Sequence, residues 1–166
     1  MPTNTNIYTG ADGAITLSVP TGAEGDTAQG VLTAYDLISV GRVQSVRVEV
    51  RNEIKVVSEI GQRYPTQLRA GNITITGTIG RAFINGALLK LLLGDAATSR
   101  PAASWTNPAF NMTLMVENAA VPGVRSTITL HDVKIHNWVY EVPEDEVVME
   151  SADFTALFID VADEPA

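Results

Sequence analysis

Residues 71–94 read GNITITGTIGRAFINGALLKLLLG, which is a strand pattern followed directly by a helix pattern. In the first half, isoleucines alternate with threonines from Ile73 to Ile79, which is the period of a half-buried strand of β-branched residues. Gly77 interrupts the apolar side, and a glycine there predicts a bend, a bulge or the close approach of another backbone. The stretch therefore predicts a strand that packs one side against a core.

A short helix is predicted immediately after this strand. Asn85 is a candidate N-cap, and Gly94 stands where a left-handed residue commonly ends a helix. A helix of about three turns is not stable alone in water, so it needs an apolar surface supplied by the rest of the chain. The predicted helix-packing residues share one stripe with spacing i, i+4, i+7 and i+8: Ile84, Leu88, Leu91 and Leu92.

Alternating apolar and polar residues predict strands on both sides of this stretch. Residues 43–60 are expected to fold back as a hairpin near Asn52 and Glu53. In residues 127–142, the apolar positions change parity after Leu130, which predicts a β-bulge near Asp132. Further strands are expected over residues 14–19, 110–116 and 147–161, a weaker one over 31–40, and polar loops over 21–30 and 61–71.

These patterns predict a fold that is mainly β. The connections between most strands have hairpin length, which favours antiparallel pairing. We expect an antiparallel β-sandwich or barrel protomer of seven or eight strands with one short flanking α-helix. The length of 166 residues suits a single domain over residues 1–166, with a flexible N-terminal arm over 1–13 and a frayed C-terminus over 163–166.

Composition excludes several kinds of protein. The chain has no cysteine, so disulfides, thiolate metal sites and cysteine nucleophiles are excluded, and a reducing compartment is expected. Residues 1–6 are polar, so no signal peptide is expected. The longest strongly apolar run, residues 87–93, contains Lys90 and is far below the roughly 20 residues that span a bilayer. We therefore expect no membrane partner.

Charge is distributed unevenly along the chain. The 11 basic and 19 acidic residues give a net charge of −8, which argues against a protein that holds nucleic acid by its phosphates. Residues 42–69 contain six basic and three acidic side chains, whereas nine acidic and no basic residues follow Lys134. Either these zones are ordinary solvated surface, or they meet across a contact between identical subunits, where opposite potentials set the register.

No motif for catalysis, nucleotide binding or metal binding occurs in the sequence. His131 and His136 could be considered as metal ligands with Asp132, but strand positions five apart lie about 16 Å from each other. Glu144 and Glu146 could form a glycosidase pair, but they fall in a predicted acidic turn. We expect no catalytic residue, no metal and no cofactor.

Two segments resemble tail tube proteins of tailed bacteriophages. RAFINGALLKLLLG, residues 81–94, is similar to the strand-to-helix passage of that family, and HDVKIHNWVYEVPEDEVVMESADFTALFIDV, residues 131–161, is similar to its C-terminal hairpin. The resemblance implies a β protomer that closes into hexameric rings, which stack into a hollow tube for the genome. It also implies a contact arm before the strand-to-helix passage, here residues 54–70, with Arg63, Tyr64 and Arg69 as contact candidates.

The same resemblance implies partners and a location. The chain would bind copies of itself, with tape-measure, tail terminator or baseplate proteins and possibly a sheath as further partners. Double-stranded DNA would pass without adhering, and the protein would be assembled in the bacterial host cytoplasm and reside in the virion tail without enzymatic activity. Arg47 and Arg51 are further contact candidates, and strand parity suggests three acidic residues that line the channel: Glu49, Asp132 and Glu150.

Alternative functions stay open at this point. Within the same class, the chain could form the tube of a phage-like bacteriocin or a type VI-like injection device. From another class, it could be a small-ligand-binding β-barrel with Trp105 and Trp138 in its pocket, although core or interface packing is the commoner role of tryptophan. An enzyme is the third possibility, and no group of residues supports it.

Overall fold

The computed structural model describes residues 7–37, 40, 42–101, 105–118, 120–121 and 123–164. These residues form a mainly β protein with antiparallel strands and two α-helices, which confirms the predicted fold class but not the number of helices. The predicted flexibility of residues 1–6 and fraying of residues 165–166 lie outside the described residues. The strands are β1 (Gly13–Ser18), β2 (Val43–Val57), β3 (Gln67–Ala82), β4 (Phe110–Glu117), β5 (Arg125–Glu141), β6 (Met149–Ala156) and β7 (Phe158–Glu164).

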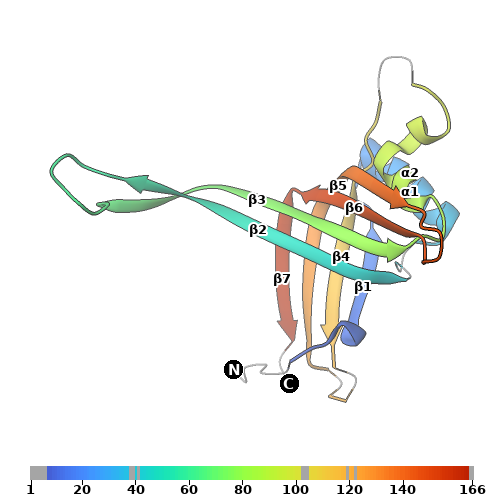
Figure 1. Ribbon diagram of the computed structural model, residues 1–166, viewed down its shortest axis with the longest axis horizontal. Coiled ribbons are helices and arrows are strands. Elements are labelled where there is room, and N and C mark those ends of the chain that lie inside the picture. Colours follow the sequence, from blue (N-terminus) through green and yellow to red (C-terminus); the bar gives the residue numbers. More distant parts are fainter. Residues whose placement is uncertain are drawn as a thin grey trace.

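The seven strands follow the order β1-β4-β5-β6-β3-β2, and β7 pairs with β5. The first half of β5 pairs with β4 and β7, and its second half pairs with β6. We call β1, β4, the first half of β5, and β7 the body section, and we call the second half of β5, β6, β3 and β2 the hairpin section. Figure 1 shows the β2–β3 hairpin running across the strands of the body section.

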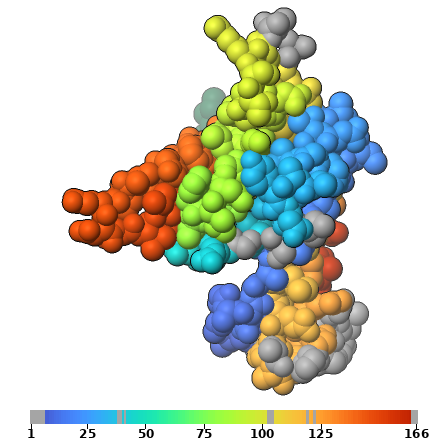
Figure 2. Space-filling model, turned by 90° about the vertical axis from the view of Figure 1, so that its right-hand side faces the viewer, coloured from blue at the N-terminus to red at the C-terminus, as the bar shows by residue number. Residues whose placement is uncertain are grey.

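The core lies between the two sections and the helices. It contains Leu17 from β1, Met112 from β4, Ile79 from β3 and Phe154 from β6, all of them buried. Figure 2 shows the helical side of the molecule, where α1 (Ala23–Tyr35, blue) and α2 (Ala87–Leu93, yellow-green) lie together. The helices therefore close one side of a curled sheet.

The predicted β-bulge near Asp132 is confirmed. Asp132 has a positive φ of 51°, and the register between β4 and β5 shifts by one residue at this point. The bulge lets both Leu130 and Val133 face the core although their parities differ. The predicted last strand is interrupted close by, because β6 and β7 are separated at Leu157, whose backbone N–H donates to the His131 carbonyl at 3.0 Å.

The prediction of a loop over residues 21–30 and a strand over 31–40 is wrong, because most of this segment forms α1. Ala28, Val31 and Leu32 are buried at helical spacing, so tertiary packing stabilises a segment with two glycines and several β-branched residues. Gly25 is required by contact: a Cβ there would lie 1.9 Å from the Pro20 carbonyl oxygen. Packing thus overrides a weak intrinsic helix propensity.

Helix α2 is shorter than predicted. It begins at Ala87, whose N–H donates to the Asn85 side-chain oxygen at 3.2 Å, and it ends before Gly94, which has a φ of 57°. Leu88 and Leu91 are fully buried, and Leu92 packs partly on the core. Ile84 precedes the helix and is half exposed, so its assignment as a helix-packing residue is wrong.

The predicted turn at Asn52 and Glu53 is also wrong. β2 continues through these residues to Val57, and only the register with β3 shifts there, so the chain turns at residues 58–66. Much of the segment predicted as a loop over 61–71 therefore belongs to β3. The hairpin projects far from the body of the molecule, and residues 54–70, which we call the arm, form its outer end (Figure 1).

Candidate assembly surfaces

The outer side of the hairpin section is polar. Since Val46, Val48, Ile79 and Phe154 pack toward the core, the residues that alternate with them point outward, and the register places these in rows across the strands. One row contains Arg47, Thr78, Asp153 and Asn137; the next contains Glu49, Thr76, Thr155 and Lys134; the third contains Arg51 and Thr74. We call these ten residues the polar face.

Asp153 is the centre of a hydrogen-bond cluster on the polar face. Its carboxylate accepts from the Asn137 amide at 2.7 Å and from the Thr78 hydroxyl at 2.7 Å, which joins β5, β6 and β3. These two bonds lower the pKa of the Asp153 carboxyl; burial opposes the shift, and the nearby His136 adds to it. Asp153 is therefore a stable anion at neutral pH.

The lowered pKa of Asp153 predicts a pH effect on stability. The folded pKa lies below the ordinary value of 3.8, so the carboxylate stabilises the fold at higher pH, and this contribution is lost as the pH falls through the folded pKa. Asp153→Asn should therefore lose less stability than the native chain when urea unfolding is followed from about pH 5 downward. Thr78→Val, which removes one donor, should show an intermediate effect. Identical pH profiles for all three proteins would contradict this account.

Glu49 binds two arginines on the same strand. Its carboxylate oxygens lie 3.3 Å from the Arg47 guanidinium and 3.3 Å from the Arg51 guanidinium. Residues two apart on a strand share a face, so the three side chains form an acid flanked by two bases. Glu49 therefore lies on a polar, solvent-exposed surface of the protomer, and its role as a channel residue stays a prediction.

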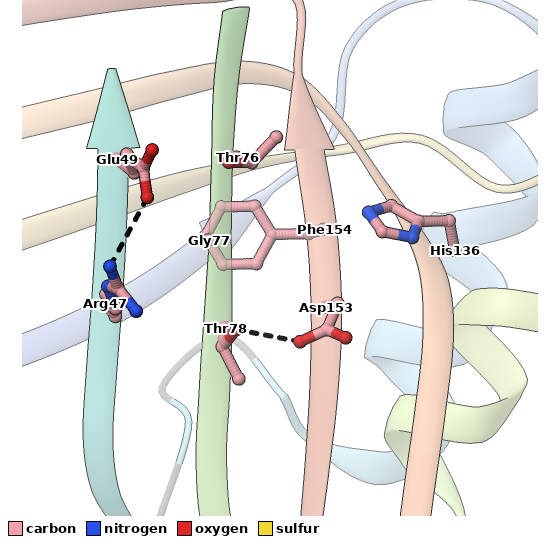
Figure 3. Close-up of a pocket in the computed structure, with 8 residues that line it drawn as sticks. All are labelled: Arg47, Glu49, Thr76, Gly77, Thr78, His136, Asp153 and Phe154. Atoms are coloured by element: carbon pink, nitrogen blue, oxygen red, sulfur yellow. Dashed lines mark hydrogen bonds and ion pairs between the residues drawn. The ribbon is translucent and has the colours of Figure 1, made fainter. Parts of the chain in front are cut away.

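A shallow hollow of about 280 Å³ opens on the polar face, lined by Arg47, Glu49, Thr76, Thr78 and His136 among others. Figure 3 shows the Thr78–Asp153 hydrogen bond and the Arg47–Glu49 ion pair at its sides, and the Phe154 ring directed toward Gly77. A Cβ on Gly77 would lie 2.4 Å from this ring and 2.2 Å from the Arg47 carbonyl oxygen. Gly77 thus permits the close approach that the sequence suggested.

Glu150 does not line an open surface, so its assignment as a channel residue is wrong. It is 2% exposed and forms a buried ion pair with Arg81, which is 1% exposed. Its second oxygen accepts from the Trp138 indole at 2.9 Å, and Arg81 also donates to the Asn85 side-chain and backbone oxygens at 3.3 Å. This network connects β3, β5 and β6 with the segment that precedes α2.

The arm and the strand residues next to it expose an apolar strip. The strip continues the core-facing side of the hairpin beyond Ile75, which is buried, and its side chains are 50–68% exposed. Contiguous exposed apolar surface is typical of an interaction site. The strip comprises Val50, Ile54, Val56, Leu68 and Ile73. Ile60 and Tyr64, in the turn at the tip, are also exposed.

The other residues predicted from the sequence to form contacts or to line the channel lie as follows. Arg63 and Tyr64 are in the turn at the tip of the arm, and Arg69 follows on β3, where its guanidinium donates to the Gln67 side chain at 3.4 Å. Asp132 lies in the β5 bulge and lines a hollow together with Glu24 of α1 and with Lys134 and Thr155 of the polar face. Lys134 forms an ion pair with Glu24 of α1 at 2.8 Å.

The hairpin section is open at both edges. Within the described residues, β2 pairs only with β3, and the second half of β5, residues 134–141, pairs only with β6. Both edges carry exposed side chains, including Val139 and Tyr140 on β5. Unpaired strand edges of this length are sites where another strand can add.

The remaining candidates do not form a chemical site. The His131 ring packs against Phe158 at 5.4 Å, and no group of acids and histidines able to hold a metal occurs among the described residues. Trp105 donates to the Leu93 carbonyl at 2.5 Å, whereas Trp138 stacks on Tyr140 at 5.3 Å. Hollows of about 280, 380 and 490 Å³ are lined by neither tryptophan.

The described part of the chain contains no helix with the length and hydropathy needed to cross a membrane. Glu144 and Glu146 are exposed in the turn between β5 and β6, as the sequence suggested.

In sequence, the chain matches no protein-family model and no curated protein. In structure, it is similar to a chain of the PVC sheath/tube terminator of an extracellular contractile injection system, with a TM-score of 0.64, 8% identity and coverage of 96% of this chain and 99% of that one. It is also similar to the SPP1 tail tube, with a TM-score of 0.58, 11% identity and coverage of 96% and 81%. A chain of the gene transfer agent virion gives a TM-score of 0.55, 9% identity and coverage of 95% and 98%.

Proposed function

We propose that this chain, whose fold is that of tail tube proteins, is a structural subunit that assembles into stacked rings and thereby into a hollow tube. The observation that carries the proposal is the hairpin section, which has two open edges and carries the polar face on one side. The fold around it is similar to that of tube-associated chains over nearly its whole length. The low identities leave the similarity as one of fold, so assembly is the property to test.

Ring closure would join the hairpin sections of neighbouring copies. Within one copy, β5 and β2 run in opposite directions at the two edges, because each of the three pairings between them is antiparallel. If β2 of one copy adds to the second half of β5 of the next, the whole barrel is antiparallel and no edge remains open. A head-to-tail contact of this kind forms a ring when the rotation closes. Six copies is the number that the family resemblance implies.

The polar face would line the channel of this barrel. A wet lumen suits side chains such as Thr74, Thr76 and Thr78, while the opposite side of the sheet is covered by the core and the helices. Double-stranded DNA is the proposed cargo. We assign no catalytic role to any residue and no cofactor to the assembly.

The arm would contact other copies. Contact with another copy would bury the exposed apolar strip. The excess of basic side chains in the arm is complementary to the acidic residues that predominate after Lys134. Tape-measure, terminator and baseplate proteins, and a sheath if the tail contracts, would then be partners at the tube ends and outer surface. We place the assembled protein in the virion tail, after assembly in the bacterial cytoplasm. An injection device related to phage tails is the second candidate, since two structural neighbours belong to an extracellular contractile injection system.

Assembly can be tested on the purified chain. Size-exclusion chromatography with light scattering, combined with negative-stain microscopy over a range of concentration and salt, should show rings or hollow tubes. A monomer under every condition would overturn the proposal.

Charge reversal in the arm should weaken stacking. Arg63→Glu with Arg69→Glu is expected to reduce tube length strongly in negative-stain images while leaving the circular dichroism spectrum unchanged, because both side chains are on the projecting arm and away from the core. Arg100→Glu, a single reversal outside the arm, serves as the control and should assemble normally. Full-length tubes from the double variant would exclude the arm arginines as stacking contacts.

A further inference from the structure

The charges of the polar face are balanced rather than acidic. Arg47 and Arg51 supply two positive charges, and Glu49 and Asp153 supply two negative ones. Lys134 is paired with Glu24 of α1, and His136 lies next to Asp153 at the edge of the hollow. This surface therefore does not share the negative net charge of the whole chain, which is −8.

The two arginines are arranged to meet an anionic polymer. They lie four residues apart on one strand, about 13 Å along its axis, and their side chains are 79% and 77% exposed. Guanidinium groups on an exposed surface bind DNA phosphates without regard to sequence. Glu49 is the carboxylate within ion-pair distance of both, so the availability of these two guanidinium groups to phosphate depends on one side chain.

We propose that Glu49 holds Arg47 and Arg51 in ion pairs so that the polar face does not bind the phosphates of duplex DNA. Such binding would require each arginine to exchange a nearby carboxylate for a phosphate, and the carboxylate left behind would repel the duplex. The consequence for DNA passage rests on the proposed function, but the binding property of the face does not.

The test compares two variants with the same change in net charge. Glu49→Gln removes the carboxylate that binds the arginines, and Glu53→Gln removes one from the same strand that forms no ion pair with any described residue. Binding of a short fluorescent DNA duplex is measured by anisotropy at several salt concentrations. Sedimentation of the same samples records whether each protein is a monomer, a ring or a tube.

Glu49→Gln should bind the duplex more tightly than the native chain at low salt. Its plot of log affinity against log salt should be steeper by about 1.8, which is about 0.9 for each arginine that becomes available to phosphate. Glu53→Gln should match the native slope, and the triple variant Arg47→Gln, Glu49→Gln, Arg51→Gln should return to it. Equal slopes for Glu49→Gln and Glu53→Gln would overturn the proposal. Because a short duplex reaches this face in a monomer or through an open ring, failure to assemble would refute the proposed function separately.

Discussion

Replacing Glu150 by alanine should lower the free energy of unfolding by about 3–5 kcal/mol, the range found when one partner of a buried ion pair is removed. Arg81, which is 1% exposed in the native chain, would lose its carboxylate partner and keep only the Asn85 oxygens as acceptors. The Trp138 indole would also lose its acceptor. The measurement is the midpoint of urea unfolding, taken at one protein concentration for all variants because self-association adds to apparent stability.

Glu49→Ala is the matched control for this prediction. Glu49 also pairs with arginine, but the partners are largely exposed, so its removal should change stability by no more than about 1 kcal/mol. The double variant Arg81→Met, Glu150→Leu should recover much of the loss, since an apolar pair leaves no buried charge. If Glu150→Ala were as mild as Glu49→Ala, the buried pair would not be a stabilising element of the fold.

Replacing Gly77 by alanine should destabilise the chain by about 3 kcal/mol or more, at the upper end of the range for overpacking a core. The new Cβ would lie 2.2 Å from the Arg47 carbonyl oxygen and 2.4 Å from the Phe154 ring. The ring could move, but the carbonyl belongs to the backbone of the neighbouring strand β2. Relief would therefore require β2 to separate from β3 at this point.

Gly30→Ala provides the contrast to Gly77→Ala. Gly30 lies in α1, and a Cβ added there would meet nothing within 4 Å beyond the backbone of its own helix, so alanine should stabilise the helix by about 0.5–1 kcal/mol. Thermal unfolding of both variants distinguishes a packing requirement at Gly77 from a general effect of glycine replacement. Similar transitions for native protein and Gly77→Ala would show that the strands tolerate the added carbon.

Local periodicity is sufficient to predict the existence of most strands. The resemblance to tail tube proteins is confirmed at the level of fold. The change of parity after Leu130 located the bulge at Asp132, because a bulge is a local event with a local sequence signal. Helix α1 is not predicted by local pattern, because its two glycines suggest a loop and its β-branched residues suggest a strand. Two signals do favour a helix: the spacing of Ala28, Val31, Leu32 and Tyr35, which matches a helical stripe, and the acidic Glu24 and Asp26 in the first turn.

The length of the hairpin could not be predicted from local pattern. Asn52 and Glu53 interrupt the apolar alternation of β2, which is typical of a turn. In the structure, β2 is continuous through both residues, and only its register with β3 shifts there. Which partner a strand finds is a tertiary property, so the outward projection of the arm and its apolar strip became visible only in three dimensions. The contact roles of Arg63, Tyr64 and Arg69 stay predictions.

Strand parity predicts the outward position of Glu49, whereas the prediction that Glu150 lines a channel is wrong. Glu150 shares its parity with Ala152 and Phe154, both fully buried, so the sequence did contain a signal that this carboxylate faces the core. Its partner Arg81 lies 69 residues earlier, and no local pattern connects the two. The Asp153 cluster was missed for the same reason, because Thr78 and Asn137 reach it from two other strands.

The position of β6 between β5 and β3 has a consequence for biosynthesis. The hairpin β2–β3 has been translated once the ribosome passes Ala82, yet the strand that attaches it to the rest of the sheet, β6, begins only at Met149. A nascent polypeptide therefore cannot complete the sheet section proposed to polymerise until all of β6 has been translated. Until then, the β2–β3 hairpin and the second half of β5 lack the strand that pairs with both, so the two edges proposed to join neighbouring copies are not yet held in one sheet.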